Sequence, residues 1–323
     1  MLRAVAAPPI TRNGGTGLAL ALLSSAAFGT SGTFATSLLD AGWSPGGAVV
    51  LRIALATTVL SAFVAPRLRA HRDDLRRGAR TLTVYGVAAI AGAQLCYFNA
   101  VDHLSVAVAL LLEYSGTLLV VLWMWARHAH RPSIFTVAGA AAAIGGLALV
   151  LDVFGDVTVD AVGVAWGLGA AVGLAVYFVI SATDDDGALP PLLTAWCGLV
   201  IGGIVLGVAA LVGVVRFDVV RADVTLLDRR MSWVVPLLGM SVLAGAFAYV
   251  AGVVGARALG AKVASFVGLT EVLFAVLFAW IAVDESLAPV QLVGGALVIV
   301  GIALVKLDGA ADAVIQPEAQ LSQ

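Results

Sequence analysis

The stretch SVAVALLLEYSGTLLVVLWMWA, residues 105–126, decides the fold of this 323-residue chain. It contains one charged side chain, Glu113, and no proline. A helix needs about 20 apolar residues to cross the hydrocarbon core of a bilayer, because it rises about 1.5 Å per residue. The stretch therefore predicts a transmembrane helix that carries an acidic group within the membrane.

Runs of similar length and apolar character fill nearly the whole chain. They do not alternate between polar and apolar residues, so they predict helices and not a β-barrel. The gaps between them are too short for a soluble domain. We predict an all-α membrane protein with ten transmembrane helices, at about 16–38, 46–65, 81–100, 105–126, 132–151, 162–182, 190–215, 231–255, 260–283 and 287–306.

The composition agrees with a membrane protein. The chain is 61% hydrophobic and 12% charged, whereas soluble domains are about half apolar and about a quarter charged. A net charge of −2 gives no reason to expect a nucleic-acid partner. Cys96 and Cys197 both lie inside apolar runs, so they are expected to be buried hydrophobic side chains and not a disulfide or a metal pair.

The basic residues predict the orientation, because loops on the cytoplasmic side are enriched in Lys and Arg. With the N-terminus inside, 13 basic residues fall on the cytoplasmic side and 4 on the outside, while Arg52 lies within a span. Both termini are therefore expected in the cytoplasm, and the protein is expected in the cytoplasmic membrane. Two features run against the rule: the acidic run at 184–186 falls inside, and all four outside arginines share one loop.

The ten predicted helices divide into two halves of five. The first repeat is expected at residues 16–151 and the second at 162–306. A short N-terminal segment (1–15), an acidic linker (152–161) and a cytoplasmic tail (307–323) complete the chain.

The two halves resemble each other in sequence. Gly139-Ala-Ala-Ala-Ala-Ile-Gly145 in the fifth span corresponds to Gly295-Ala-Leu-Val-Ile-Val-Gly301 in the tenth, and the fourth and ninth spans each carry a glutamate. Chance similarity between helices rich in Ala and Gly is the alternative, which two matched spans and two glutamates disfavour. Because each half has an odd number of helices, the repeats should be inverted, with a site near the midplane where they meet.

The sequence resembles the drug/metabolite transporter superfamily, in particular its EamA-type members with ten spans and two repeats. Three segments carry the resemblance: residues 94–114 with Gln94, Tyr97 and Glu113; residues 259–272 with Ser265 and Glu271; and residues 284–301. The resemblance implies a secondary transporter of a small organic metabolite. In this family a proline often follows the fourth-span glutamate, where this chain reads Tyr114-Ser-Gly116, so a bend of this helix is an open question.

Glu113 and Glu271 are the first choice for functional groups. A charged group at the bilayer centre costs at least about 2.5–3.5 kcal/mol, so each glutamate should face a cavity or a partner, or be protonated. A carboxyl group in such a place gains and loses a proton more readily near neutral pH, which suits proton coupling. The alternative is a structural carboxylate bonded to a neighbouring helix.

Seven further residues are expected along the substrate or proton path. Arg52 is the only basic residue in the interior of a predicted span; its long side chain could reach the interface, or it could pair with an interior carboxylate or a substrate carboxylate. Asn99 lies near a helix end and could only cap it. Each of the others is equally suited to an interhelical hydrogen bond. The full set is Glu113, Glu271, Gln94, Tyr97, Tyr114, Tyr249, Ser265, Asn99 and Arg52.

The sequence contains no motif for catalysis or for nucleotide binding. Gly29-Thr-Ser-Gly-Thr33 lacks the final glycine of a nucleophile elbow, and residues 255–263 lack the adjacent Lys-Ser/Thr of a phosphate loop. We therefore expect no enzyme, no cofactor and no metal, and any active transport must be secondary. The expected partners are a small-molecule substrate, the lipid bilayer and protons, with export preferred over uptake or facilitated exchange. A membrane accessory protein without transport is the other class, and the chain is expected to be a monomer or a homodimer.

Overall fold

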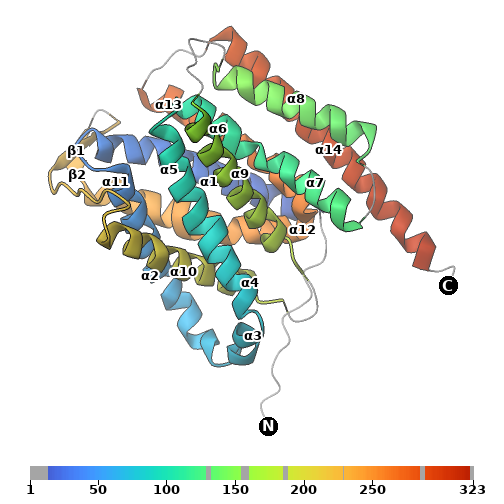
Figure 1. The fold of residues 1–323 in the computed structure, drawn as a ribbon, viewed down its shortest axis with the longest axis horizontal. Coiled ribbons are helices and arrows are strands. Elements are labelled where there is room, and N and C mark those ends of the chain that lie inside the picture. The colour runs from blue at the N-terminus through green and yellow to red at the C-terminus, as the bar shows by residue number, and fades with distance from the viewer. Residues whose placement is uncertain are drawn as a thin grey trace.

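The computed structural model is almost entirely helical (Figure 1). It describes residues 14–128, 132–153, 160–184, 188–227, 229–283 and 288–320. Most of the predicted N-terminal segment, the centre of the predicted linker and the last three residues lie outside the described residues.

The first half of the chain forms nine helical segments. Three of them begin after a serine that caps the helix: Ser44, Ser105 and Ser133 each accept a hydrogen bond from a backbone N–H three residues further on. The segments are α1 (Gly14–Leu39), α2 (Pro45–Leu68), α3 (Arg72–Arg77), α4 (Ala79–Val84), η1 (Tyr85–Gly92), α5 (Ala93–Val101), α6 (Val106–Tyr114), α7 (Gly116–His128) and α8 (Ile134–Val150).

The second half repeats this pattern and adds a short antiparallel hairpin, β1 (Asp223–Leu226) and β2 (Arg229–Ser232). The residues just before the hairpin lie against the turn between α1 and α2, where Trp43 Nε1 donates a hydrogen bond of 2.6 Å to the Val220 carbonyl oxygen. The helices are α9 (Ala161–Ser181), α10 (Pro191–Leu211), α11 (Val234–Gly239), η2 (Met240–Phe247), α12 (Ala248–Gly268), α13 (Thr270–Val283) and α14 (Pro289–Gln320).

The number of spans differs in detail from the prediction. Eight helical stretches of the described chain are long and apolar enough to cross a membrane, and two apolar helices, Ile134–Val150 and Thr270–Ile281, are shorter. The predicted eighth and ninth spans are not separated by a loop. They meet at Gly260, which lies within α12 and has φ 78° and ψ 159°, so that α12 is two helices joined at a kink. Glycine adopts this backbone conformation readily because it has no Cβ.

The third span of each half contains a π-helical segment. η1 lies between α4 and α5, and η2 lies between α11 and α12. π-helices are rare and occur often at functional sites. Their presence at matching positions is a similarity between the halves that residue composition did not reveal.

The helix that carries Glu113 is interrupted without a proline. α6 ends at Tyr114, and α7 begins at Gly116 after a turn at Ser115, whose hydroxyl bonds back to the Leu112 carbonyl oxygen at 2.6 Å. Gly116 lies against α9, where an added Cβ would come within 2.5 Å of the Ala171 carbonyl oxygen. In the second half, a similar turn at Leu269 separates α12 from α13. The fourth and ninth spans are thus both broken next to their glutamates.

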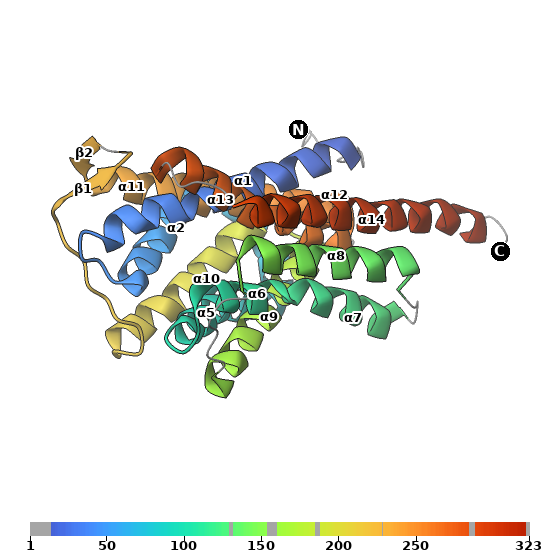
Figure 2. The same ribbon diagram turned by 90° about the horizontal axis from the view of Figure 1, so that it is seen from above.

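α8 and α14 run side by side along one edge of the molecule (Figures 1 and 2). Their contacts are reciprocal, because a Cβ added at Gly146 would lie 2.5 Å from the Gly294 carbonyl oxygen, and one added at Gly294 would lie 2.6 Å from that of Gly146. Gly139 and Gly301 form the second such pair. The sequence similarity pairs Gly139 with Gly295 and Gly145 with Gly301. In the structure Gly145 and Gly295 meet no neighbour closer than 3.6 Å, and the adjacent Gly146 and Gly294 make the contact, so the correspondence between the two helices is shifted by one residue.

An ion pair and two hydroxyl groups join α8, α12 and α14 at the N-terminal end of α8. Lys262 Nζ donates to Asp308 at 2.8 Å, and Thr136 donates to the same carboxylate at 2.5 Å. Ser133, the cap of α8, donates to its other oxygen. Asp308 is buried, and one cation and two hydroxyl groups balance its charge, as a buried charge requires.

Candidate substrate cavity

A cavity of about 740 Å³ lies between the two halves of the chain. Its wall is built from the first four spans of the first half (α1, α2, η1 to α5, and α6) and the first, third and fourth spans of the second (α9, η2 to α12, and α13). This volume falls in the usual range of about 300–1,000 Å³ for small-molecule sites. The cavity is large enough for a metabolite with its hydration water.

Both predicted glutamates lie on the cavity wall. Glu113 comes from the last turn of α6 and Glu271 from the first turn of α13, so each is within two residues of a helix break. Both side chains are half-buried. Tyr114 interacts with Glu271 through its hydroxyl group, which brings the two repeats into contact at this point.

Arg52 also faces the cavity, and its exposed fraction is only 7%. Its Nη1 donates to the Ser31 hydroxyl at 2.9 Å. It lies close enough to Glu271 and Tyr249 to interact electrostatically with both. This burial disfavours the interpretation in which the side chain reaches the membrane interface, and it favours the alternative of an interior partner.

Four of the remaining predicted residues line the cavity and two do not. Gln94, Tyr97, Tyr114 and Tyr249 are part of the wall. Asn99 lies outside it, and its side-chain amide donates to the Leu95 carbonyl oxygen of its own helix at 2.7 Å. Ser265 is fully buried away from the cavity and bonds to the Lys262 carbonyl oxygen at 2.8 Å. Both side chains satisfy backbone groups locally, as polar side chains in membrane helices commonly do.

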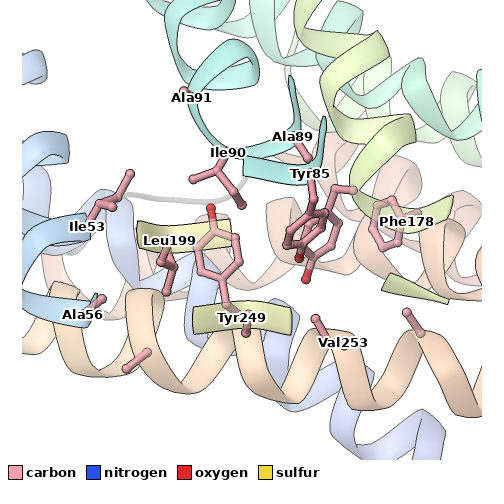
Figure 3. Packing of buried hydrophobic residues seen from close by; sticks show 14 of the residues in the cluster. Ile53, Ala56, Tyr85, Ala89, Ile90, Ala91, Phe178, Leu199, Tyr249 and Val253 are labelled. Carbon is pink, nitrogen blue, oxygen red and sulfur yellow. The ribbon is translucent and has the colours of Figure 1, made fainter. Parts of the chain in front are cut away.

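Aromatic side chains form one side of the cavity and continue into the core (Figure 3). Tyr249 is central: its ring lies 5.0 Å from that of Phe28 and 5.9 Å from that of Tyr177, both nearly edge to face. Phe178 lies 5.0 Å from Tyr177. Behind them Tyr85, in η1, stacks on Tyr177 and shares a hydrogen bond of 3.1 Å with Ser181. Such a wall suits an apolar or aromatic part of a ligand.

Residues of α1 and α9 also line the cavity, although they were not predicted from the sequence. From α1, Ser24, Phe28 and Ser31 line the cavity, and from α9, Tyr177 and Phe178 do so. The α1 residues are four and three positions apart, which puts them on one face of the helix. This spacing of polar and aromatic residues in an otherwise apolar span is a signal that could have identified the face.

The fold and the cavity define a class: a multi-pass α-helical membrane protein with a central site between two repeats. The fold is shared with a solved structure described only as a crystal structure of a protein, with a TM-score of 0.72 and 17% identity, covering 92% of this chain and 98% of the other. No curated protein matches the sequence significantly.

The profile of the EamA-like transporter family matches residues 15–152 and 161–307, and the chain belongs to this family. The resemblance noted in the sequence is thereby confirmed. Members of the family are membrane transporters of small molecules. The predicted multi-pass membrane protein is therefore confirmed, and so is the predicted transporter at the level of a small-molecule substrate.

Proposed function

We propose that the protein is a secondary transporter of a small organic metabolite, such as an amino acid or a related compound, that works by alternating access. Export coupled to proton entry is the direction that we favour. The observation that carries the proposal is the cavity, whose wall combines an acidic group from each repeat with a buried arginine and an aromatic side. Uptake and facilitated exchange are the alternatives, and both are compatible with the same two-repeat architecture.

Inverted repeats are the basis of the proposed mechanism. The reciprocal contacts of Gly139 with Gly301 and of Gly146 with Gly294 have the form that a two-fold axis between α8 and α14 would produce. In addition, the first helix of each half packs mainly against the other half: α1 against α12 and α13, and α9 against α5, α6 and α7. Two such halves can rock about a site that they share.

Glu113 and Glu271 are the proposed proton carriers. The groups that interact electrostatically with one or both glutamates are Cys96, Tyr97, Tyr114, Tyr177, Tyr249 and Arg52, and the two glutamates also interact with each other. A carboxylate without a close cation is costly to bury in a membrane protein, and proton binding removes that cost. Proton binding can therefore be linked to the choice between two conformations.

The proposed orientation has both termini in the cytoplasm, in the cytoplasmic membrane. Leu39, Pro45, Val101, Val106 and Leu151 lie at helix ends and line the cavity. All five belong to the side assigned to the outside, so the cavity reaches that face. We take this conformation as outward-open.

Reconstitution into liposomes tests the proposed function. Labelled amino acids, nucleobases and cationic drugs would be offered with and without an imposed pH gradient, and we expect uptake of at least one solute that responds to the gradient. A folded protein that moves no solute under either condition would contradict transport and favour an accessory role. Gradient-independent movement would support facilitated exchange instead.

A further inference from the structure

Arg52 is the only basic side chain on the described part of the cavity wall. It comes from α2, and its exposed fraction of 7% leaves the guanidinium largely out of solvent. A buried charge is costly unless it is paired and hydrogen-bonded. The partners of Arg52 therefore indicate whether its role is structural or functional.

The guanidinium has few partners among the described residues. Nη1 donates to Ser31, and Nε is buried without any acceptor. In the described chain, no carboxylate oxygen lies within the 4.0 Å limit of an ion pair with Arg52. Glu271 acts on it only at longer range.

A second arginine, Arg257, shows the contrast: it falls between two predicted spans, but the structure places it inside α12. It donates to the Leu189 carbonyl oxygen at 2.6 Å and to Thr194 at 3.2 Å, and Asp184 lies 4.0 Å away, although its Nε is buried without an acceptor like that of Arg52. These contacts join α12 to the N-terminal part of α10 and to residues that precede α10. Arg52 is oriented by one hydroxyl group only; among the described residues its Nη2 has no protein acceptor, and its Nε is buried.

The guanidinium of Arg52, on the cavity wall, therefore keeps Nη2 as a charged donor without a protein acceptor among the described residues, and such a donor forms short, strong hydrogen bonds with carboxylate oxygens. We propose that Arg52 binds a carboxylate group of the transported solute, so that the cavity selects carboxylate-bearing solutes over cationic or neutral ones. The assignment rests on the proposed transport function for its physiological role. The aromatic side chains of the cavity wall, among them Tyr249, which interacts electrostatically with Arg52, would receive the apolar part of the same solute.

Equilibrium binding to the full chain in lipid nanodiscs tests the assignment. The probes are phenylalanine, 3-phenylpropionate, which lacks the amine, and phenethylamine, which lacks the carboxylate, so the aromatic part is constant. We expect the wild type to bind both carboxylate probes about tenfold or more tightly than phenethylamine, as charge-assisted hydrogen bonds imply. Arg52→Gln should abolish this preference, and Arg52→Lys should restore only part of it because it lacks the fork.

Arg216→Gln is the matched control, since it removes an exposed arginine from a loop outside the cavity. It should bind all three probes as the wild type does. If Arg52→Gln does not fold, Ser31→Ala replaces it, because loss of the orienting hydroxyl should weaken the carboxylate probes about threefold to tenfold and leave phenethylamine unchanged.

Two results would overturn the assignment. One is a wild type that shows no preference for the carboxylate probes, and the other is a folded variant that loses all three probes equally. Transport is measured separately in liposomes, so the two proposals can fail independently. Transport of phenethylamine alone, unchanged by Arg52→Gln, would support the transport function and contradict the carboxylate site at Arg52. Arg52-dependent binding of the carboxylate probes without transport of any solute would support the site and contradict the transport function.

Discussion

Two buried ionic sites in this protein use their charges in opposite ways. Within α14, Asp308 is held by Lys262, Ser133 and Thr136, so the carboxylate is almost completely satisfied. In the cavity, Arg52 has a single hydroxyl partner, and Glu113 has no ion-pair partner among the described residues. A satisfied buried charge joins helices, whereas an unsatisfied one is stable only with water, a proton or a ligand.

The difference teaches how to separate structural from functional charges within a membrane chain. Burial alone does not distinguish Asp308 from Arg52, since they are 8% and 7% exposed. The number and geometry of their hydrogen-bond and ion-pair partners within the protein distinguish them. Variants at the satisfied site should therefore change stability, and variants in the cavity should change transport.

Glu113→Gln and Glu271→Gln should have the largest effect on function. Glutamine keeps the size of the side chain but cannot exchange a proton, so we expect transport driven by a pH gradient to fall by about tenfold or more, which is a loss of about 1.4 kcal/mol of coupling. Thermal unfolding should change little. Liposome assays over a range of pH would check this, and an unaltered pH profile in both variants would remove the glutamates from the mechanism.

Gly146→Val should have one of the two largest effects on stability. The Cβ would come within 2.5 Å of a backbone oxygen, and the two helices must then separate because backbone atoms cannot move aside as a side chain can. Overpacking of this kind costs about 1–3 kcal/mol. Gly145→Val is the matched control, with no neighbour within 4 Å of its added Cβ. Equal thermal midpoints for the two variants would show that the α8–α14 contact is not close-packed.

Asp308→Asn should lower stability by about 1.5–3 kcal/mol, because Lys262 would lose the anion that balances it. The thermal midpoint should fall, while affinity for the transported solute should stay the same. Asp102→Asn, at an exposed helix end, serves as a control with little change expected. A large loss of affinity in Asp308→Asn would mean that this site communicates with the cavity.

Asn99→Ala and Ser265→Ala should have the smallest effects. Both side chains bond to a carbonyl oxygen of their own helix and lie outside the cavity wall, so we expect less than about 0.5–1 kcal/mol in stability and no change in transport. Solute affinity measured beside wild type is the check. A tenfold change in either variant would extend the functional site beyond the described cavity.

Much of the candidate site could be predicted from single residues that are out of place in an apolar run. Glu113, Glu271 and Arg52 are conspicuous because charge inside a membrane is costly. Phe28, Tyr177 and Phe178 were missed, since aromatic residues are ordinary in a transmembrane helix and their role depends on which face points inward. Asn99 and Ser265 were included although they bond locally, because a polar side chain does not show by itself whether its partner is a substrate or its own backbone.

The sequence alone determined the all-helical membrane fold, the approximate positions of the spans and the family. These follow from hydrocarbon length and apolarity, which act on each segment separately. Only the tertiary structure decided which glycines of α8 and α14 make contact, that Gly260 replaces a loop by a kink, and that Arg52 lines the cavity with one hydroxyl partner while Asp308 has three partners. Those outcomes depend on the relative rotation and close approach of helices far apart in the chain, which no single segment encodes.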